Sequence, residues 1–146
     1  MTKKIISIIF VITSFIYAKD IIQKESRYEV NKTVSEIEKI VTSKGMSVFA
    51  VIDHKAAAES VNMNMHDSKV IIFGNPKIDA RIMLKDERAA LDLPFKILIY
   101  KDANGKTQIL YSNPQTLKKR YDLKECQAID MMEAFLNTIT NKVGKK

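Results

Sequence analysis

The sequence predicts an α+β fold: one compact domain with an antiparallel or mixed sheet packed by helices. First, β-prone apolar runs alternate with stretches of helical periodicity in the order β-α-β-(α)-β-α-β-β-α-α. Second, an Asn-Gly turn joins two of the strands directly, which requires antiparallel pairing. Third, an expected signal peptide over 1–18 leaves 128 of the 146 residues, a length that forms a single core.

The N-terminus is typical of a secretory signal peptide. Lys3 and Lys4 precede an apolar run from Ile5 to Ile16, and Ala18 offers a cleavage site. The run is shorter than the roughly 20 residues that cross a bilayer. We expect an exported protein, periplasmic or extracellular, without a stable membrane anchor after cleavage; an uncleaved interfacial anchor is the alternative.

The first two elements of the domain are a strand and an amphipathic helix. Ile21 to Tyr28 contains no strong turn former and is expected to be a strand. A helix over about 33–44 follows, because Thr33 and Glu36 match a capping box and Gly45 supplies a stop. Its apolar residues recur at helical spacing: Val34, Ile37, Ile40 and Val41.

The middle of the chain reads as two strands separated by a helical turn and a loop. Met46–Ile52 and Lys69–Phe73 are β-prone, Lys55–Val61 is alanine-rich, and Asn62–Asp67 is polar. The second strand is expected to end at Gly74-Asn75-Pro76, because proline cannot continue a ladder.

The last part predicts a hairpin between helices. Residues 78–90 favour helix. Leu93–Tyr100 and Lys106–Tyr111 form the hairpin, Asn113-Pro114 opens a short helix, and a helix over about 125–141 presents one apolar stripe.

Composition excludes several classes of function. The net charge of +7 is spread along the chain without an aromatic-interleaved basic stripe, so nucleic acid is not an expected partner. Cys126 is the only cysteine, so an internal disulfide is impossible. No Cys/His metal-ligand spacing, phosphate loop or serine nucleophile elbow occurs, and we expect no cofactor.

Four motifs carry a resemblance to a known family. They are FAVIDHKAAA (Phe49–Ala58), FGNPK (Phe73–Lys77), LDLPFK (Leu91–Lys96) and the weaker YSNP (Tyr111–Pro114). From about Val30 to Leu123 the chain resembles the DUF302 family, a domain of unknown function. The resemblance implies a compact α+β domain, often dimeric, found alone in exported bacterial proteins. It implies no reaction.

Polar residues at or inside predicted strands are the candidate ligand-binding site. Asp53 and His54 follow a strand, and Asn75 follows another. Lys96 interrupts an apolar strand, so it must reach water or meet a carboxylate such as Asp53 or Asp92. An ion pair with Asp53 is the favoured expectation. His54, Asn75 and Lys96 are expected to line one cleft for a small anionic or polar ligand.

A copper site is the weaker alternative for the polar loop. Thioether and imidazole ligands suit Cu(I), and Met63, Met65 and His66 lie close in sequence. Their spacing is not diagnostic, and methionine is also a common core filler. The prediction is therefore no metal.

Three functional hypotheses remain open. The leading one is an exported ligand-binding or accessory module with a small polar pocket. The alternatives are an undescribed enzyme acting through Asp53, His54 and Lys96, and a homodimeric interaction module. A shared pocket for His54, Asn75 and Lys96 favours the first two, whereas a scattered arrangement with a flat apolar patch favours the third.

Overall fold

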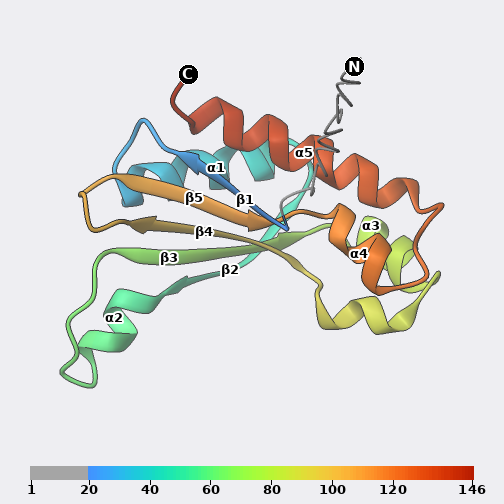
Figure 1. Cartoon of the computed structure of the whole chain (residues 1–146), viewed down its shortest axis with the longest axis horizontal. Coiled ribbons are helices and arrows are strands. Elements are labelled where there is room, and N and C mark those ends of the chain that lie inside the picture. The colour runs from blue at the N-terminus through green and yellow to red at the C-terminus, as the bar shows by residue number, and fades with distance from the viewer. Residues whose placement is uncertain (1–19) are drawn as a thin grey trace, which may run out of the picture.

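A computed structural model describes residues 20–146 as one five-stranded sheet with helices (Figure 1). The strand order is β1-β5-β4-β3-β2, and every neighbouring pair is antiparallel. The predicted α+β class is confirmed, and the sheet is antiparallel rather than mixed. The strands are β1 (Ile21–Glu25), β2 (Ser47–Asp53), β3 (Ser68–Gly74), β4 (Phe95–Lys101) and β5 (Thr107–Ser112).

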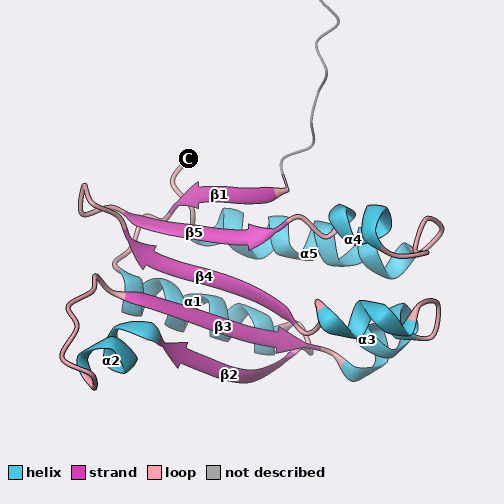
Figure 2. Cartoon of the chain, turned by 60° about the horizontal axis from the view of Figure 1, so that its bottom comes forward, coloured by secondary structure: helices cyan, strands magenta, loops and turns pink. Residues whose placement is uncertain are grey.

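The two long helices cover the same face of the sheet, and the short ones lie at its ends (Figure 2). The long helices are α1 (Val30–Ser43) and α5 (Gln127–Val143). The short ones are α2 (His54–Glu59), α3 (Pro76–Met83), the 3-10 helix η1 (Glu87–Leu91) and α4 (Gln115–Arg120).

Strand alternation places the core between the sheet and the two long helices. Successive strand residues point to opposite faces, and Ile71, Ile97 and Ile109 are fully buried on the helix-covered face. The ring of Phe73 lies 6.0 Å from that of Phe135 on α5. The core is therefore a single layer of side chains between sheet and helices.

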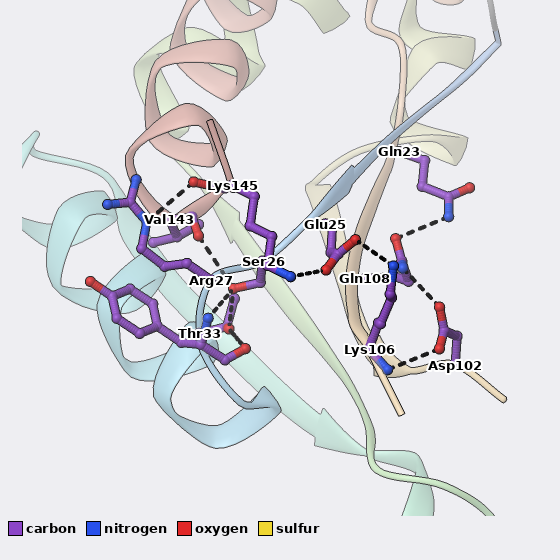
Figure 3. Close-up of polar contacts among 12 residues, drawn as sticks. Gln23, Glu25, Ser26, Arg27, Thr33, Asp102, Lys106, Gln108, Val143 and Lys145 are labelled. Carbon is purple, nitrogen blue, oxygen red and sulfur yellow. Dashed lines mark hydrogen bonds and ion pairs between the residues drawn. The ribbon is translucent and has the colours of Figure 1, made fainter. Parts of the chain in front are cut away.

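On the other face of the sheet, here called the open face, residues 20–146 place no covering helix (Figure 2). Val70, Leu98 and Leu110 form a half-buried apolar row across β3, β4 and β5, because Val70 pairs with Leu98 and Leu98 with Leu110. Toward the β4–β5 turn the face becomes polar. There Gln23 Nε2 donates to Gln108 Oε1 at 3.1 Å (Figure 3).

The first strand is shorter than predicted, and the C-terminus lies beside its end. β1 stops at Glu25, and Ser26 then forms an isolated bridge with Gly144. Glu25 forms ion pairs with both Lys106 and Lys145 (Figure 3). These contacts fix the C-terminal tail to the edge of the sheet.

The predicted start of the first helix is wrong by one turn. α1 begins at Val30, and the Thr33 side chain lies inside the helix instead of capping it. Its hydroxyl lies 2.7 Å from Ser26 Oγ and donates to the carbonyls of Tyr28 and Glu29. Burial of Val30 in the core explains the earlier start.

The predicted helix over 78–90 is two separate elements. α3 ends at Met83, and Leu84 beyond it is exposed. Asp86 then begins η1, with its carboxylate accepting from Arg88 N at 3.1 Å. The Asp86 side chain competes with helix continuation by capping a new turn.

The expected signal peptide over 1–18 lies outside the described residues. Among residues 20–146, no helix combines the length and apolar character that crossing a bilayer requires.

Candidate functional site

Asp53 and His54 lie where β2 ends and α2 begins. Asp53 Oδ1 accepts from Ala56 N at 3.0 Å, which caps α2, and Asp53 Oδ2 lies 3.0 Å from Lys69 Nζ on the neighbouring strand. The hydrogen bond from Ala56 N and the contact with Lys69 hold the pKa of Asp53 below its usual value. His54 is exposed beside it.

Asn75 lies between β3 and α3. Its Oδ1 accepts from Lys77 N at 3.0 Å and so caps α3, while its Nδ2 donates to the Gly45 carbonyl at 3.0 Å. Both ends of the carboxamide are therefore engaged in holding the turn. This is the ordinary structural use of asparagine before a helix.

Lys96 lies on the open face near the start of β4, and its side chain is exposed. The predicted ion pair between Asp53 and Lys96 is wrong. β3 separates the two strands that carry them, and Asp53 pairs with Lys69 instead. Because this face of the sheet is exposed, water hydrates the Lys96 ammonium, and the lysine needs no carboxylate partner inside the fold.

A pocket of about 530 Å³ lies at the end of the sheet where Lys96 stands. We call it the sheet-end pocket. It is formed by the start of β1, the segment entering β4, and the segment from the end of β5 into α4. The lining residues are Asp20, Ile21, Asp92, Phe95, Lys96, Ser112, Asn113, Pro114, Thr116, Leu117, Lys119 and Arg120.

Asn113 connects two walls of the sheet-end pocket. Its side-chain Oδ1 accepts from Gln115 N at 3.0 Å, which fixes the first turn before α4. Its backbone N–H donates to the Asp20 carbonyl at 2.8 Å, which holds the start of the described chain against β5. Because Asn113 is buried, these bonds stabilise the shape of the pocket.

The charges of the sheet-end pocket are unequally neutralised. Asp92 Oδ2 accepts from Arg120 Nη1 and from the Tyr121 hydroxyl, each at 2.6 Å. Burial would raise the pKa of Asp92, but these two bonds and the charge of Lys96 bring it below its usual value. Within residues 20–146, Lys96 and Lys119 have no hydrogen bond or ion pair of their own. The Asp20 side chain, which also belongs to the lining, has none within these residues either, so two cations and one carboxylate of the pocket remain unpaired.

The predicted site residues are not brought together. Of Asp53, His54, Asn75 and Lys96, only Lys96 lines the sheet-end pocket. Asp53 and His54 lie toward the opposite end of β3, since Asp53 pairs with Lys69 whereas Lys96 pairs with Ile72. Asp53 and His54 of the enzyme hypothesis thus do not share this pocket with Lys96. This scattering counts against a site built from His54, Asn75 and Lys96 together and in favour of the homodimeric hypothesis.

A family model described as "Domain of unknown function DUF302" matches residues 22–139. The chain belongs to the DUF302 family. A crystal structure of an uncharacterized conserved DUF302 protein from Bacillus stearothermophilus has the same fold, with a TM-score of 0.78 at 17% sequence identity. The similarity covers 86% of this chain and 99% of that one.

The DUF302 domain also resembles part of longer curated proteins. A segment of 100 residues is 34% identical to the fluoride-specific ion channel FluC 1 of Brucella suis biovar 1 (strain 1330) and to that of Brucella abortus biovar 1 (strain 9-941). These matches cover 68% of this chain but 39% and 37% of those proteins. The chain thus spans about two-fifths of the length of these relatives.

Two of the motifs that carry the DUF302 resemblance meet at the sheet-end pocket. LDLPFK supplies Asp92, Phe95 and Lys96, and YSNP supplies Ser112, Asn113 and Pro114. Sequence reasoning missed Lys119 and Arg120. Their signal was the basic run at residues 118–120, which begins four residues after the end of YSNP.

The residues of the weak copper hypothesis lie in the exposed loop after α2. Met63, Met65 and His66 are all exposed. The part of the DUF302 domain that the structure describes holds no group of three or more His, Cys, Asp or Glu side chains arranged for a metal ion.

Proposed function

We propose that this DUF302 protein is an exported module that binds a small anionic or polar ligand in the sheet-end pocket. The observation that carries the proposal is that Lys96 and Lys119 line the pocket without a hydrogen bond or ion pair elsewhere in residues 20–146. The nearby Asp92 is occupied by Arg120. The lining carries three cations, Lys96, Lys119 and Arg120, against the two carboxylates Asp20 and Asp92, so one net positive charge favours a ligand anion.

The size and position of the pocket fit a small ligand. Its volume of about 530 Å³ is within the usual range for small-molecule sites, roughly 300–1,000 Å³. Three separate chain segments converge on it, so a ligand would contact parts of the domain that are distant in sequence. The basic N-terminus followed by an apolar run supports export, and the Brucella relatives support an accessory role, because a similar segment forms part of proteins named as ion channels.

Thermal unfolding with a panel of anions tests this proposal. Fluoride, chloride, acetate, phosphate and sulfate are compared at equal ionic strength, and at least one is expected to raise the melting temperature, because a ligand that binds only the folded state stabilises it. Lys96→Met and Lys119→Met should lose that shift. Lys85→Met, which changes an exposed lysine outside the pocket lining, is the control and should keep it.

Lys96→Met should also leave the unfolding free energy within about 0.5 kcal/mol of wild type. Lys96 is exposed and forms no ion pair with any described residue, and such a lysine contributes little to stability. A wild-type protein that no anion stabilises would overturn the binding proposal. A shift that survives in both Lys96→Met and Lys119→Met would place the bound anion elsewhere.

We propose homodimerisation as a second candidate function, because exposed apolar side chains concentrate at one edge of the sheet. Six of the eleven exposed large apolar residues in the described part lie on β2 or just after α2. We call this group the β2 edge: Phe49, Val51, Ile52, Val61, Met63 and Met65. The helix α2 itself buries no residue.

The β2 edge fits a second copy of itself. From Ser47 to Ile52 the strand contains no charged residue or proline, two of the usual protections of an edge strand. A third, an irregular register, is confined to the step between Val48 and Ala50. In such a dimer the two β2 strands pair antiparallel, and the two-fold axis passes beside Val51. Ala50 then lies opposite Ile52 of the partner subunit, and no two residues of like charge face each other. At the other edge of the sheet, by contrast, Glu25 and the bridge to Gly144 protect β1.

Light scattering across a concentration series tests the dimer. Wild type and Leu84→Lys, which alters an exposed apolar residue away from the β2 edge, should dimerise, and Val51→Lys should be monomeric. A monomer at all concentrations, or a Val51→Lys dimer, would rule out this interface.

A further inference from the structure

An apolar groove on the open face adjoins the sheet-end pocket. Its volume is about 230 Å³, and Val70, Leu98 and Leu110 form its floor. The groove and the pocket share Ile21, Lys96 and Ser112. The two cavities are therefore adjacent, and Lys96 lines both of them.

The Lys96 side chain can contact both the polar pocket and the apolar groove. Long lysine side chains place their methylene groups along apolar surface and keep the ammonium in a polar region. Leu98 lies two residues further along β4 on the same face, and Lys119 lines the adjoining polar pocket. A molecule held by the Lys96 ammonium thus meets cations on one side and hydrocarbon side chains on the other.

We propose that the natural ligand is an amphipathic anion, with its carboxylate or phosphate head in the sheet-end pocket and a hydrocarbon chain along the groove. This inference rests on the proposed function and names the chemical class of the ligand. The row from Val70 to Leu110 crosses two strand spacings, roughly 10 Å. A medium-length alkyl chain covers this row and removes its apolar surface from water.

The polar end of the open face limits where the chain lies. Gln23, Gln108 and Asp102 form a hydrogen-bonded series, with Gln108 Nε2 donating to Asp102 Oδ2 at 2.8 Å. Gln23 pairs with Leu110 across β1 and β5, so this polar series begins directly beside the apolar row. The hydrocarbon chain is therefore confined to the apolar row across β5, β4 and β3 and does not extend past Leu110 toward Gln23.

Titration calorimetry with a chain-length series tests the inference. Acetate, hexanoate, octanoate and octyl phosphate are used below their micelle-forming concentrations, with octylamine and octanol as controls for charge. Octanoate or octyl phosphate should bind at least tenfold more tightly than acetate or phosphate, respectively. Octylamine and octanol should bind at least tenfold more weakly than octanoate.

Two variants test separately how the anionic head and the hydrocarbon chain of the ligand contribute to binding. Lys96→Met should abolish binding of all the anions, whereas Leu98→Gln should remove the gain from chain length and leave acetate affinity within about threefold. Leu84→Gln, at an exposed apolar position outside the groove, should behave as wild type. If Leu98→Gln does not fold, the chain-length series on the wild-type protein still decides the question.

The outcomes distinguish this inference from the proposed function. Equal affinity for acetate and octanoate overturns the amphipathic ligand but leaves the anion site. An absence of binding by every anion overturns both. Binding to vesicles of anionic phospholipid without binding of soluble octanoate or octyl phosphate would assign the surface to a membrane and overturn the inference. A wild-type dimer that Leu98→Gln converts to monomer would assign the groove to a subunit interface and would also overturn it.

Discussion

The carboxylate of Asp79 lies directly over Gly74. A Cβ atom built on Gly74 would stand 2.4 Å from Asp79 Oδ2 and 3.0 Å from Cε2 of Phe49. Gly74 ends β3, and Asp79 belongs to the first turns of α3. The missing side chain of Gly74 therefore allows α3 to fold back onto the strand that precedes it.

Gly74→Ala should destabilise the fold by about 1–3 kcal/mol, the usual cost of inserting a methyl group into a packed site. Urea unfolding measures the loss. The double variant Gly74→Ala/Asp79→Ala should recover most of it relative to Asp79→Ala alone, because the nearest clashing atom is gone. Equal losses in both backgrounds would show that Asp79 does not limit the space.

The stability of Asp79→Asn relative to wild type should increase as the pH rises. Burial raises the pKa of Asp79, although a backbone hydrogen bond from Asn75 opposes the shift. Its buried Oδ1 has no hydrogen-bond partner among residues 20–146. The folded state thus binds the proton more tightly than the unfolded state, and Asp79 stabilises less as the pH rises from about 4, the unfolded pKa, through the folded pKa.

The variant lacks this titration, so its unfolding free energy minus that of wild type should increase between about pH 4 and pH 7. Urea unfolding at a series of pH values measures the difference. A difference that stays constant or decreases with pH would contradict the raised pKa.

Thr33→Val should cost about 1–3 kcal/mol, because it removes a buried hydroxyl that lies 2.7 Å from Ser26 Oγ. Thr42→Val is the matched control on the same helix. The Thr42 hydroxyl is exposed and bonds only to backbone carbonyls, so its loss should change stability by less than about 0.5 kcal/mol. Comparable losses would mean that the pairing with Ser26 contributes nothing.

Mass spectrometry of protein recovered outside the cytoplasm should find Lys19 as the first residue, because the apolar run before Ala18 is typical of a cleaved signal peptide. Protein retained in the membrane fraction with Met1 or its neighbours still attached would contradict cleavage and favour the interfacial anchor.

Local patterns predicted most of the fold. The hairpin was predictable because Asn104-Gly105 is a strong turn signal, and Gly105 does adopt a positive φ of 76°. The last helix was predictable from its apolar stripe, with an observed span of Gln127–Val143. The start of α1 was not predictable, because the Thr33 hydroxyl could either cap a helix or form a buried hydrogen bond. The bond to Ser26 becomes visible only in the folded structure.

The candidate site was predictable only at Lys96. A lysine inside an apolar strand is visible in the sequence, but whether its face is covered depends on where helices pack, and here that face is open. The signal of Lys119, a basic run at residues 118–120, was weaker, because basic residues on a short helix are ordinary. The place of Lys119 in the same pocket as Lys96 arises from the turn at Asn113-Pro114, which leads from β5 into α4.

The position of the C-terminal tail determines how this domain can be attached to something else. Ile21 pairs with Ser112 at the pocket end of the sheet, whereas Glu25 pairs with Gln108 at the other end, where Lys145 also lies. A surface, label or second polypeptide joined after Lys146 would therefore stand away from the cavity and leave its entrance free. A tag placed immediately before Asp20 would stand in the wall of the cavity, so immobilised assays should use the C-terminal attachment.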